Sequence, residues 1–180
     1  AWAELEVHRG IAEGLEAVLV NPCVVIGPGL AGRSSMTMVE RIRKGTRFSP
    51  AGSNAVVDAR DVATAMTRLI TEGATGERYL LIGENLPYRK LFTLIAASAG
   101  RPAPSLLLPK WALELGWRAE ALRTLFGGRP LITRNTAGTA SRERCYDGKK
   151  AEVLWGLRFR AAEEAVHNVA AFLADRCDPA

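Results

Sequence analysis

Residues 17–32 read AVLVNPCVVIGPGLAG, and this stretch decides how the rest of the chain is interpreted. It contains a glycine fingerprint, G-x-G-x-x-G, formed by Gly27, Gly29 and Gly32. Such a loop lets backbone amides at a helix N-terminus approach a pyrophosphate, because a side chain at these positions would block the approach. A second interpretation starts from Asn21 and Pro22, which interrupt the apolar run and make residues 17–20 a strand that opens into a ligand-facing loop. The two interpretations predict different functions.

The composition is that of a globular protein. The chain has 180 residues, of which 48% are hydrophobic and 24% charged, enough for one domain or for a piece of a larger enzyme. The formal net charge of +5 is spread along the chain, whereas a nucleic-acid-binding surface would be more concentrated and rich in interleaved aromatic residues. We therefore expect a small-molecule ligand, which could be anionic, and no nucleic-acid partner.

The cysteines and the N-terminal region indicate whether the protein holds a metal, forms disulfides or enters a membrane. Cys23, Cys145 and Cys177 are far apart and lack C-x-x-C spacing, which argues against a zinc site and against a disulfide framework. The first residues are too acidic for a signal peptide, and no apolar run reaches the roughly 18 residues of a membrane helix. These features predict a cytoplasmic protein with reduced thiols, no metal and no membrane partner.

Helical periodicity and turn residues divide the chain into alternating elements. Strands are expected over 17–20, 55–57 and 78–82, and helices over 2–14, 34–44, 62–70, 91–99, 109–126 and 162–173. Asp61 stands where it could cap the helix over 62–70. The pattern predicts an α/β fold.

Four segments, in this order, carry a resemblance to a known family. They are VNPCVVIGPG at 20–29, VDARDVA at 57–63, GERYLLIG at 76–83, and YDGKKA at 146–151 followed by LWGL at 154–157. Together they resemble the C-terminal half of an extended short-chain dehydrogenase/reductase, in the NAD-dependent epimerase/dehydratase group and its dihydroflavonol-reductase-like branch. The resemblance implies the C-terminal part of a Rossmann-like parallel sheet with a small, mostly helical substrate-binding lobe. By it, residues 1–29 and 55–83 would end the Rossmann-like part, and residues 30–54 and 84–180 would form the lobe and closing helices.

The resemblance also implies a chemistry: hydride transfer between NAD or NADP and a sugar-nucleotide or small carbonyl or alcohol substrate. Pro22, Cys23, Val24 and Val25 match the loop whose backbone lies against the nicotinamide, and Ser34 could face the same ligand. The family's glycine fingerprint and catalytic Tyr-x-x-x-Lys are not found at their expected places, so no catalytic residue is assigned. We expect the chain to be inactive without the missing N-terminal half.

Two features of the sequence resemble catalytic residues. Tyr146 and Lys150 have the spacing Y-x-x-x-K, with Thr133 upstream, but Asp147 and Gly148 between them favour a turn over the helix that this chemistry needs. A loop with solvated charges is therefore expected. Cys23 has no basic neighbour in sequence to activate it, so we expect a small buried residue.

Two other functions stay open. The chain could be a non-catalytic α/β binding or interaction module, or a small Rossmann protein that uses Gly27–Gly32 as a phosphate loop. A sheet that lacks its first strands would expose an edge and an apolar face. We therefore expect poor solubility of the chain alone, or a homodimer that covers these surfaces.

Overall fold

The fold is described from a computed structural model, which describes residues 2–30, 32–124 and 138–175. Short strands and helices alternate along the chain, so the predicted α/β class is confirmed. The helices are α1 (Trp2–Ala12), α2 (Ser34–Arg43), α3 (Ala59–Glu72), α4 (Tyr88–Ser98), α5 (Lys110–Thr124), α7 (Lys149–Trp155) and α8 (Ala162–Asp175). The strands are β1 (Leu19–Pro22), β2 (Val24–Ile26), β3 (Phe48–Pro50), β4 (Ser53–Asp58), β5 (Arg78–Leu81), β6 (Glu84–Pro87) and β7 (Leu106–Leu108).

Two strand systems meet near Cys23. β1 and β5 run parallel, with Asn21 opposite Leu80. After Cys23 the chain continues as β2, which pairs in parallel with β4, and β4 pairs on its other side with antiparallel β6. At the point of separation the Cys23 amide still donates to the Leu81 carbonyl at 3.2 Å. In open α/β sheets, ligands bind beyond the carboxyl ends of strands where neighbouring connections diverge.

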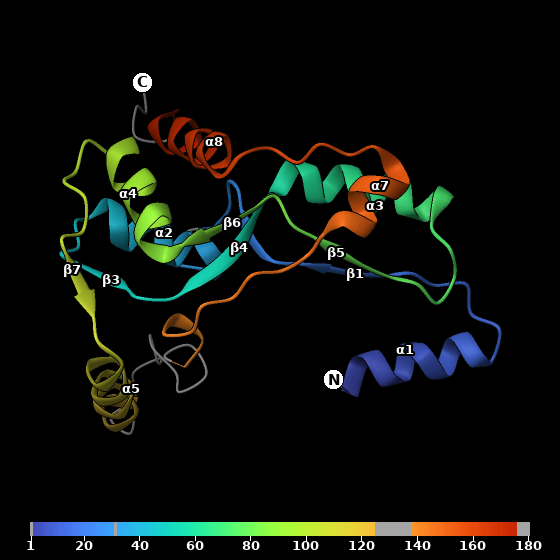
Figure 1. Cartoon of the computed structure of the whole chain (residues 1–180), viewed down its shortest axis with the longest axis horizontal. Coiled ribbons are helices and arrows are strands. Elements are labelled where there is room, and N and C mark those ends of the chain that lie inside the picture. The colour runs from blue at the N-terminus through green and yellow to red at the C-terminus, as the bar shows by residue number, and fades with distance from the viewer. Residues whose placement is uncertain (1, 31, 125–137, 176–180) are drawn as a thin grey trace.

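Helices cover both faces of the β1–β5 pair. Figure 1 shows α3 and α7 on one face and α1 on the other. Ala65 of α3 and Ala151 of α7 are fully buried together with Val57 and Leu81, and these residues form one apolar core. Asn21 points to the α1 side, where its Nδ2 donates to Glu4 Oε1 at 3.3 Å.

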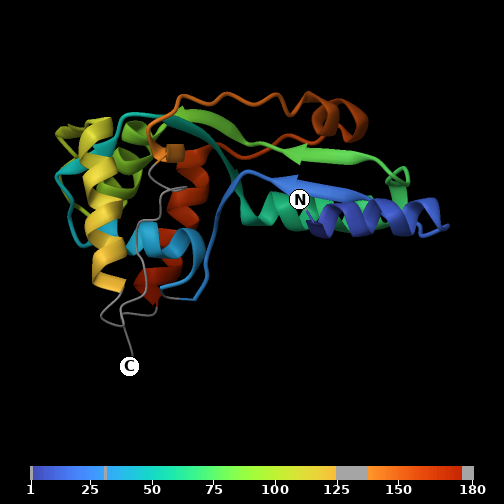
Figure 2. The same cartoon turned by 90° about the horizontal axis from the view of Figure 1, so that it is seen from below.

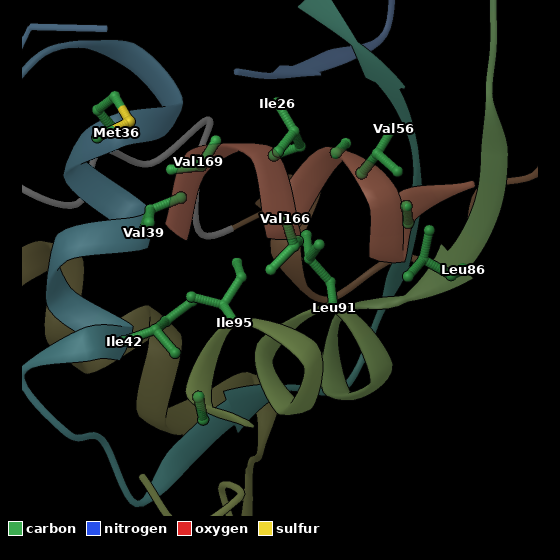
Figure 3. Packing of buried hydrophobic residues seen from close by; sticks show 13 residues of the cluster. Ile26, Met36, Val39, Ile42, Val56, Leu86, Leu91, Ile95, Val166 and Val169 are labelled. Atoms are coloured by element: carbon green, nitrogen blue, oxygen red, sulfur yellow. The ribbon is translucent and has the colours of Figure 1, made fainter. Parts of the chain in front are cut away.

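A larger core holds the other end of the molecule together. It lies among α2, α4, α8 and the β2–β4–β6 sheet, and Figure 3 shows side chains of the three helices pointing toward one another. Its largest fully buried side chains are Ile26, Ile42, Leu91, Ile95 and Val169. Full burial of each stabilises the fold by about 1.5–3 kcal/mol. Figure 2 shows the two groups of elements at opposite ends of the molecule, joined through β2, β4 and the chain before α8.

Two local expectations are wrong. The first strand is Leu19–Pro22 rather than residues 17–20, because the Ala17 carbonyl accepts from the Gly76 amide in a turn before the ladder begins. The cap of α3 is Asp58, whose Oδ1 accepts from the Arg60 amide at 2.8 Å. Asp61 lies inside the first turn of α3, because β4 reaches Asp58 and the helix follows it directly.

Candidate functional site

A surface pocket of about 230 Å³ lies where β1 and β5 separate. The residues that line it are Asn21, Pro22, Cys23, Val24, Asn54, Leu80 and Tyr146. They come from four separate parts of the chain, and four of the seven form the stretch from the end of β1 to the start of β2. The pocket therefore lies where the strand topology predicts a ligand.

The stretch from Asn21 to Val24 forms one wall of the pocket, called here the loop wall. Three of the predicted cofactor residues, Pro22, Cys23 and Val24, line the pocket. Val25 is not among the lining residues and packs against the core beneath α3, as Cys23 also does. Ser34 begins α2, and its side chain lies outside what the structure describes.

Burial keeps the Cys23 sulfur protonated. Removal of the Cys23 thiol from water raises its pKa to about 11, although backbone hydrogen bonds at Gly83, Cys23 and Val24 oppose the shift. The raised pKa leaves almost no thiolate at neutral pH, and the thiolate is the nucleophilic form. Cys23 therefore acts as part of the wall, in agreement with the sequence prediction.

We expect slow alkylation of Cys23 in the native protein. In a Cys145→Ser/Cys177→Ser variant, a two-unit pKa rise leaves roughly a hundredfold less thiolate at pH 8, of which higher intrinsic nucleophilicity recovers roughly tenfold. Iodoacetamide should thus react about tenfold more slowly with native than with urea-unfolded protein. The native rate should rise about tenfold per pH unit up to about pH 10, because the thiolate forms only as the pH approaches the raised pKa. A native rate equal to the unfolded rate would contradict this assignment.

Residues 140–146, called here the strap, lead to Tyr146, which lines the pocket. The Gly52 amide donates to the Ala140 carbonyl at 3.0 Å and the Ser53 amide to the Arg142 carbonyl at 3.1 Å. The Ser53 hydroxyl bonds to the backbone of Arg144 in both directions, at 3.0 and 2.8 Å. These hydrogen bonds attach the strap to the start of β4 and to the residue before it.

Tyr146 ends the strap and reaches the pocket. Its amide donates to Asn85 Oδ1 and its carbonyl accepts from Asn85 Nδ2, both at 2.9 Å. Its hydroxyl accepts from Arg144 Nη1 at 3.3 Å. Because the fixing contacts come from Ser53 and Asn85, no pattern near Tyr146 in sequence could place it in the pocket.

The Y-x-x-x-K spacing does not form a catalytic pair, as the sequence predicts. Tyr146 lies before α7, which begins at Lys149, so the two side chains do not share a helical turn. Lys150 turns to β5, where its Nζ donates to Glu77 and to the Arg78 carbonyl and lies 4.7 Å from the centre of the Tyr79 ring. Thr133 falls outside the described residues.

The three glycines of the fingerprint have local structural reasons. A Cβ on Gly27 would lie 2.4 Å from the Cβ of Ala59, so glycine lets the end of β2 approach the start of α3. A Cβ on Gly29 would meet Met36 Cγ at 3.3 Å, and Gly32 has a φ of +71°. Packing and turn geometry thus account for these glycines without a phosphate.

We expect Gly27→Ala to destabilise the fold by about 1–2 kcal/mol, because a methyl group would overlap Ala59 at a strand–helix contact. Gly29→Ala should cost less, since the Met36 side chain can move away. Urea unfolding of both variants measures the difference. Equal costs would show that packing against Ala59 is not what requires Gly27.

The pocket suits the nicotinamide end of a dinucleotide. Pro22 and Val24 offer an apolar surface for a planar ring. Asn21 also lines the pocket, but its Oδ1 is buried within the protein and has no hydrogen-bond partner among the described residues. The apolar lining therefore fits the ring of the group that the sequence resemblance implies.

Metal clusters and membrane-spanning helices are the other features that could define a site. These residues hold no cluster of three or more His, Cys, Asp or Glu side chains that could bind a metal ion. None of their helices combines the length and apolar character that a membrane crossing requires. The pocket at the end of β1 is thus the candidate site.

Comparison with known proteins gives the relationship. No model of a known protein family matches the sequence. A dihydroflavonol 4-reductase-like protein from Synechocystis is 28% identical over 174 residues, which are 92% of this chain and 50% of that protein. The chain thus spans about half the length of this curated relative.

Solved structures of related enzymes agree with the relationship found by sequence. A nucleoside-diphosphate-sugar epimerase from Pseudomonas aeruginosa matches with a TM-score of 0.74 and 25% identity over 97% of this chain and 54% of the epimerase. The chain is related to dihydroflavonol-reductase-like and epimerase/dehydratase enzymes. RMD from Pseudomonas aeruginosa, solved with NADPH, shares the fold at a TM-score of 0.60 and 18% identity, over 93% of this chain and 51% of RMD. The resemblance and the Rossmann-like fold predicted from the sequence are confirmed.

Proposed function

We propose that the chain supplies one wall of the active site in an NAD(P)-dependent oxidoreductase or epimerase. The substrate would be a sugar nucleotide or a small carbonyl or alcohol compound. The observation that carries the proposal is the pocket at the end of β1, where Pro22, Cys23 and Val24 of the loop wall form a largely apolar lining. The relationship to epimerase/dehydratase enzymes supports it.

In this proposal a bound nicotinamide supplies the hydride chemistry, and the chain orients it. Pro22, Cys23 and Val24 would lie against the ring. The neutral Cys23 thiol would keep the wall uncharged and exclude water. Tyr146 and Lys150 are not arranged as a proton-transfer pair, so we propose that the chain alone does not turn over substrate.

We further propose that the chain combines the end of a Rossmann-like part (residues 1–29 and 55–83) with a substrate lobe and closing helices (30–54 and 84–180). The two cores support this division in part, since one draws on β1, α3 and β5 and the other on α2, α4 and α8, together with Ile26 and Val56 from the Rossmann-like part. Ala151 of α7 packs in the first of these and would tie the closing segment back to the sheet. The free thiols of Cys23 and Cys145 suit a cytoplasmic location.

Titration with dinucleotide fragments tests the function. Nicotinamide mononucleotide should bind weakly and shift the NMR resonances of the backbone amides of Cys23, Val24 and Val25, which follow Pro22. Full NAD or NADP should bind little better, because the adenosine end would have no partner in this chain. Tight binding of ADP-ribose that Gly29→Ala abolishes would instead support the small Rossmann protein. Absence of any shift at the loop wall would refute the proposed function.

The alternative, a non-catalytic interaction module, is favoured by exposed apolar side chains. Trp2 and Leu5 on α1 are 85% and 60% exposed, and Ile70 on α3 is 83% exposed. Within the described residues β1 pairs with β5 alone, which leaves one strand edge open. A homodimer would cover these surfaces. Sedimentation equilibrium checks it: a monomer that stays soluble at high concentration would argue against this alternative.

A further inference from the structure

One end of the molecule carries a group of exposed apolar side chains, called here the apolar end patch. Its members come from β3, β7 and the first half of α5: Phe48, Leu106, Leu107, Trp111 and Leu115. Trp111 and Leu115 are 68% and 56% exposed, and the other three are about half exposed. Figure 1 shows β3, β7 and α5 at the end of the molecule opposite α1. Exposed apolar groups of this kind mark a surface that binds a protein or a membrane.

Strand pairing and helix geometry bring these residues together. Phe48 stands opposite Leu106 in the parallel β3–β7 pair, and the Leu106 amide donates to the Arg47 carbonyl at 2.9 Å. A single residue separates the end of β7 from the start of α5. Trp111 and Leu115 are four residues apart in α5, so they lie on the same side of that helix. The lining of the pocket at the end of β1 includes none of the patch residues.

The positive charge of the chain is concentrated beside this patch. The two segments that lead to β3 and β7, residues 41–48 (RIRKGTRF) and 101–108 (RPAPSLLL), contain five basic residues and no acidic one. Their formal charge of +5 equals that of the whole chain, so the remaining residues carry no net charge. Four of these side chains are exposed and have no ion pair with a described residue: Arg41, Lys44, Arg47 and Arg101. The pairing of β3 with β7 thus gathers a charge that looks spread along the sequence.

The combination favours an anionic membrane surface over a second copy of the chain. Tryptophan and leucine enter the boundary between lipid headgroups and acyl chains, and the lipid phosphates attract arginine and lysine beside them. In a symmetric dimer through this patch, the unpaired cations of both copies would face each other and repel. A segment that lies on a membrane needs no apolar run long enough to cross it.

We propose that the apolar end patch and its flanking cations dock the protein on the surface of an anionic membrane. Trp111 and Leu115 would enter the headgroup boundary, and Arg47 and Arg101 would pair with lipid phosphates. The chain lies on the membrane in this arrangement and does not cross it, which revises the expectation of no membrane partner. Nothing in this docking requires a bound nicotinamide, so it stands apart from the proposed function.

Sedimentation of the whole chain with lipid vesicles tests this docking. Vesicles of phosphatidylcholine with about one quarter phosphatidylglycerol should bind the chain. Vesicles of phosphatidylcholine alone should bind it at least about tenfold more weakly, because each cation near an anionic surface contributes about fivefold to binding. Arg47→Gln/Arg101→Gln should weaken binding to the mixed vesicles about thirtyfold, and Trp111→Ala about tenfold. Added salt should also weaken it, because salt screens the lipid phosphates.

Control variants separate the patch from general effects. Arg9→Gln/Lys149→Gln removes the same charge from exposed positions in α1 and α7, and Ile70→Ala removes an exposed apolar side chain from α3. Both should bind the mixed vesicles as the unmodified chain does. Binding that is absent, that is equally strong without phosphatidylglycerol, or that the controls weaken as much would overturn the docking. If Trp111→Ala instead splits a dimer of the chain in sedimentation without lipid, the patch joins two copies and the membrane docking is wrong.

Discussion

Replacing Gly52 by alanine should lower the free energy of unfolding by about 3 kcal/mol and detach the strap from β4. The added Cβ would lie 2.3 Å from the Arg142 carbonyl oxygen and 2.7 Å from the Ala140 carbonyl oxygen, so backbone has to move. Overpacking costs about 1–3 kcal/mol, and the bonds from the Gly52 and Ser53 amides, worth about 1 kcal/mol each, would weaken. Urea unfolding measures this loss, and the melting temperature should fall by about 10 °C.

The same substitution should loosen Tyr146 in the pocket, because the strap that leads to it loses its contacts with β4 and only the Asn85 bonds to the Tyr146 backbone remain. The NMR resonances of Tyr146 should then change, whereas nicotinamide mononucleotide should still shift the loop wall. Gly116→Ala is the matched control: a Cβ there meets nothing within 4 Å and lies in α5. It should be neutral or stabilise by about 0.5–1 kcal/mol. If Gly52→Ala behaves like this control, the strap is not held through Gly52.

The loop wall is predictable from sequence because its cause is local. An apolar run broken by Asn21 and Pro22 marks a strand end wherever the strand lies in the sheet, and Pro22, Cys23 and Val24 do line the pocket. Val25 is not among the lining residues and packs against the smaller core. The helices over 34–44 and 162–173 are also found, since each has a periodic apolar face that meets the larger core.

The rest of the site depends on long-range register. Leu80 enters the pocket because β5 pairs with β1 so that Leu80 stands opposite Asn21. Tyr146 enters it through contacts with Ser53 and Asn85, and its own neighbours in sequence indicate only a turn. The glycine fingerprint misleads for a related reason: the contact that requires glycine at position 27 is with Ala59, which the spacing of the glycines cannot show.

Asp61→Ala should lower the free energy of unfolding by about 2–3 kcal/mol, because Asp61 joins the two ends of the molecule. Its side chain is 8% exposed, Oδ2 accepts from the Arg160 amide at 2.7 Å, and Oδ1 pairs with the Arg160 guanidinium. Removing one partner of a buried ion pair costs about 3–5 kcal/mol. The cost expected here is lower, because Arg160 is 36% exposed and also bonds to Glu164 at 3.0 Å.

Asp61→Asn separates charge from hydrogen bonding in this contact. The asparagine can still accept from the Arg160 amide, so its cost should be about 1 kcal/mol. Glu13→Ala serves as the control, because the Arg9–Glu13 pair is 70% exposed on both sides and should contribute less than about 0.5 kcal/mol. Urea unfolding followed by circular dichroism gives all three values. Because Arg160 leads directly into α8 and Asp61 lies in α3, a cost for Asp61→Ala no larger than that of Glu13→Ala would mean that the two cores are held together by their strands alone.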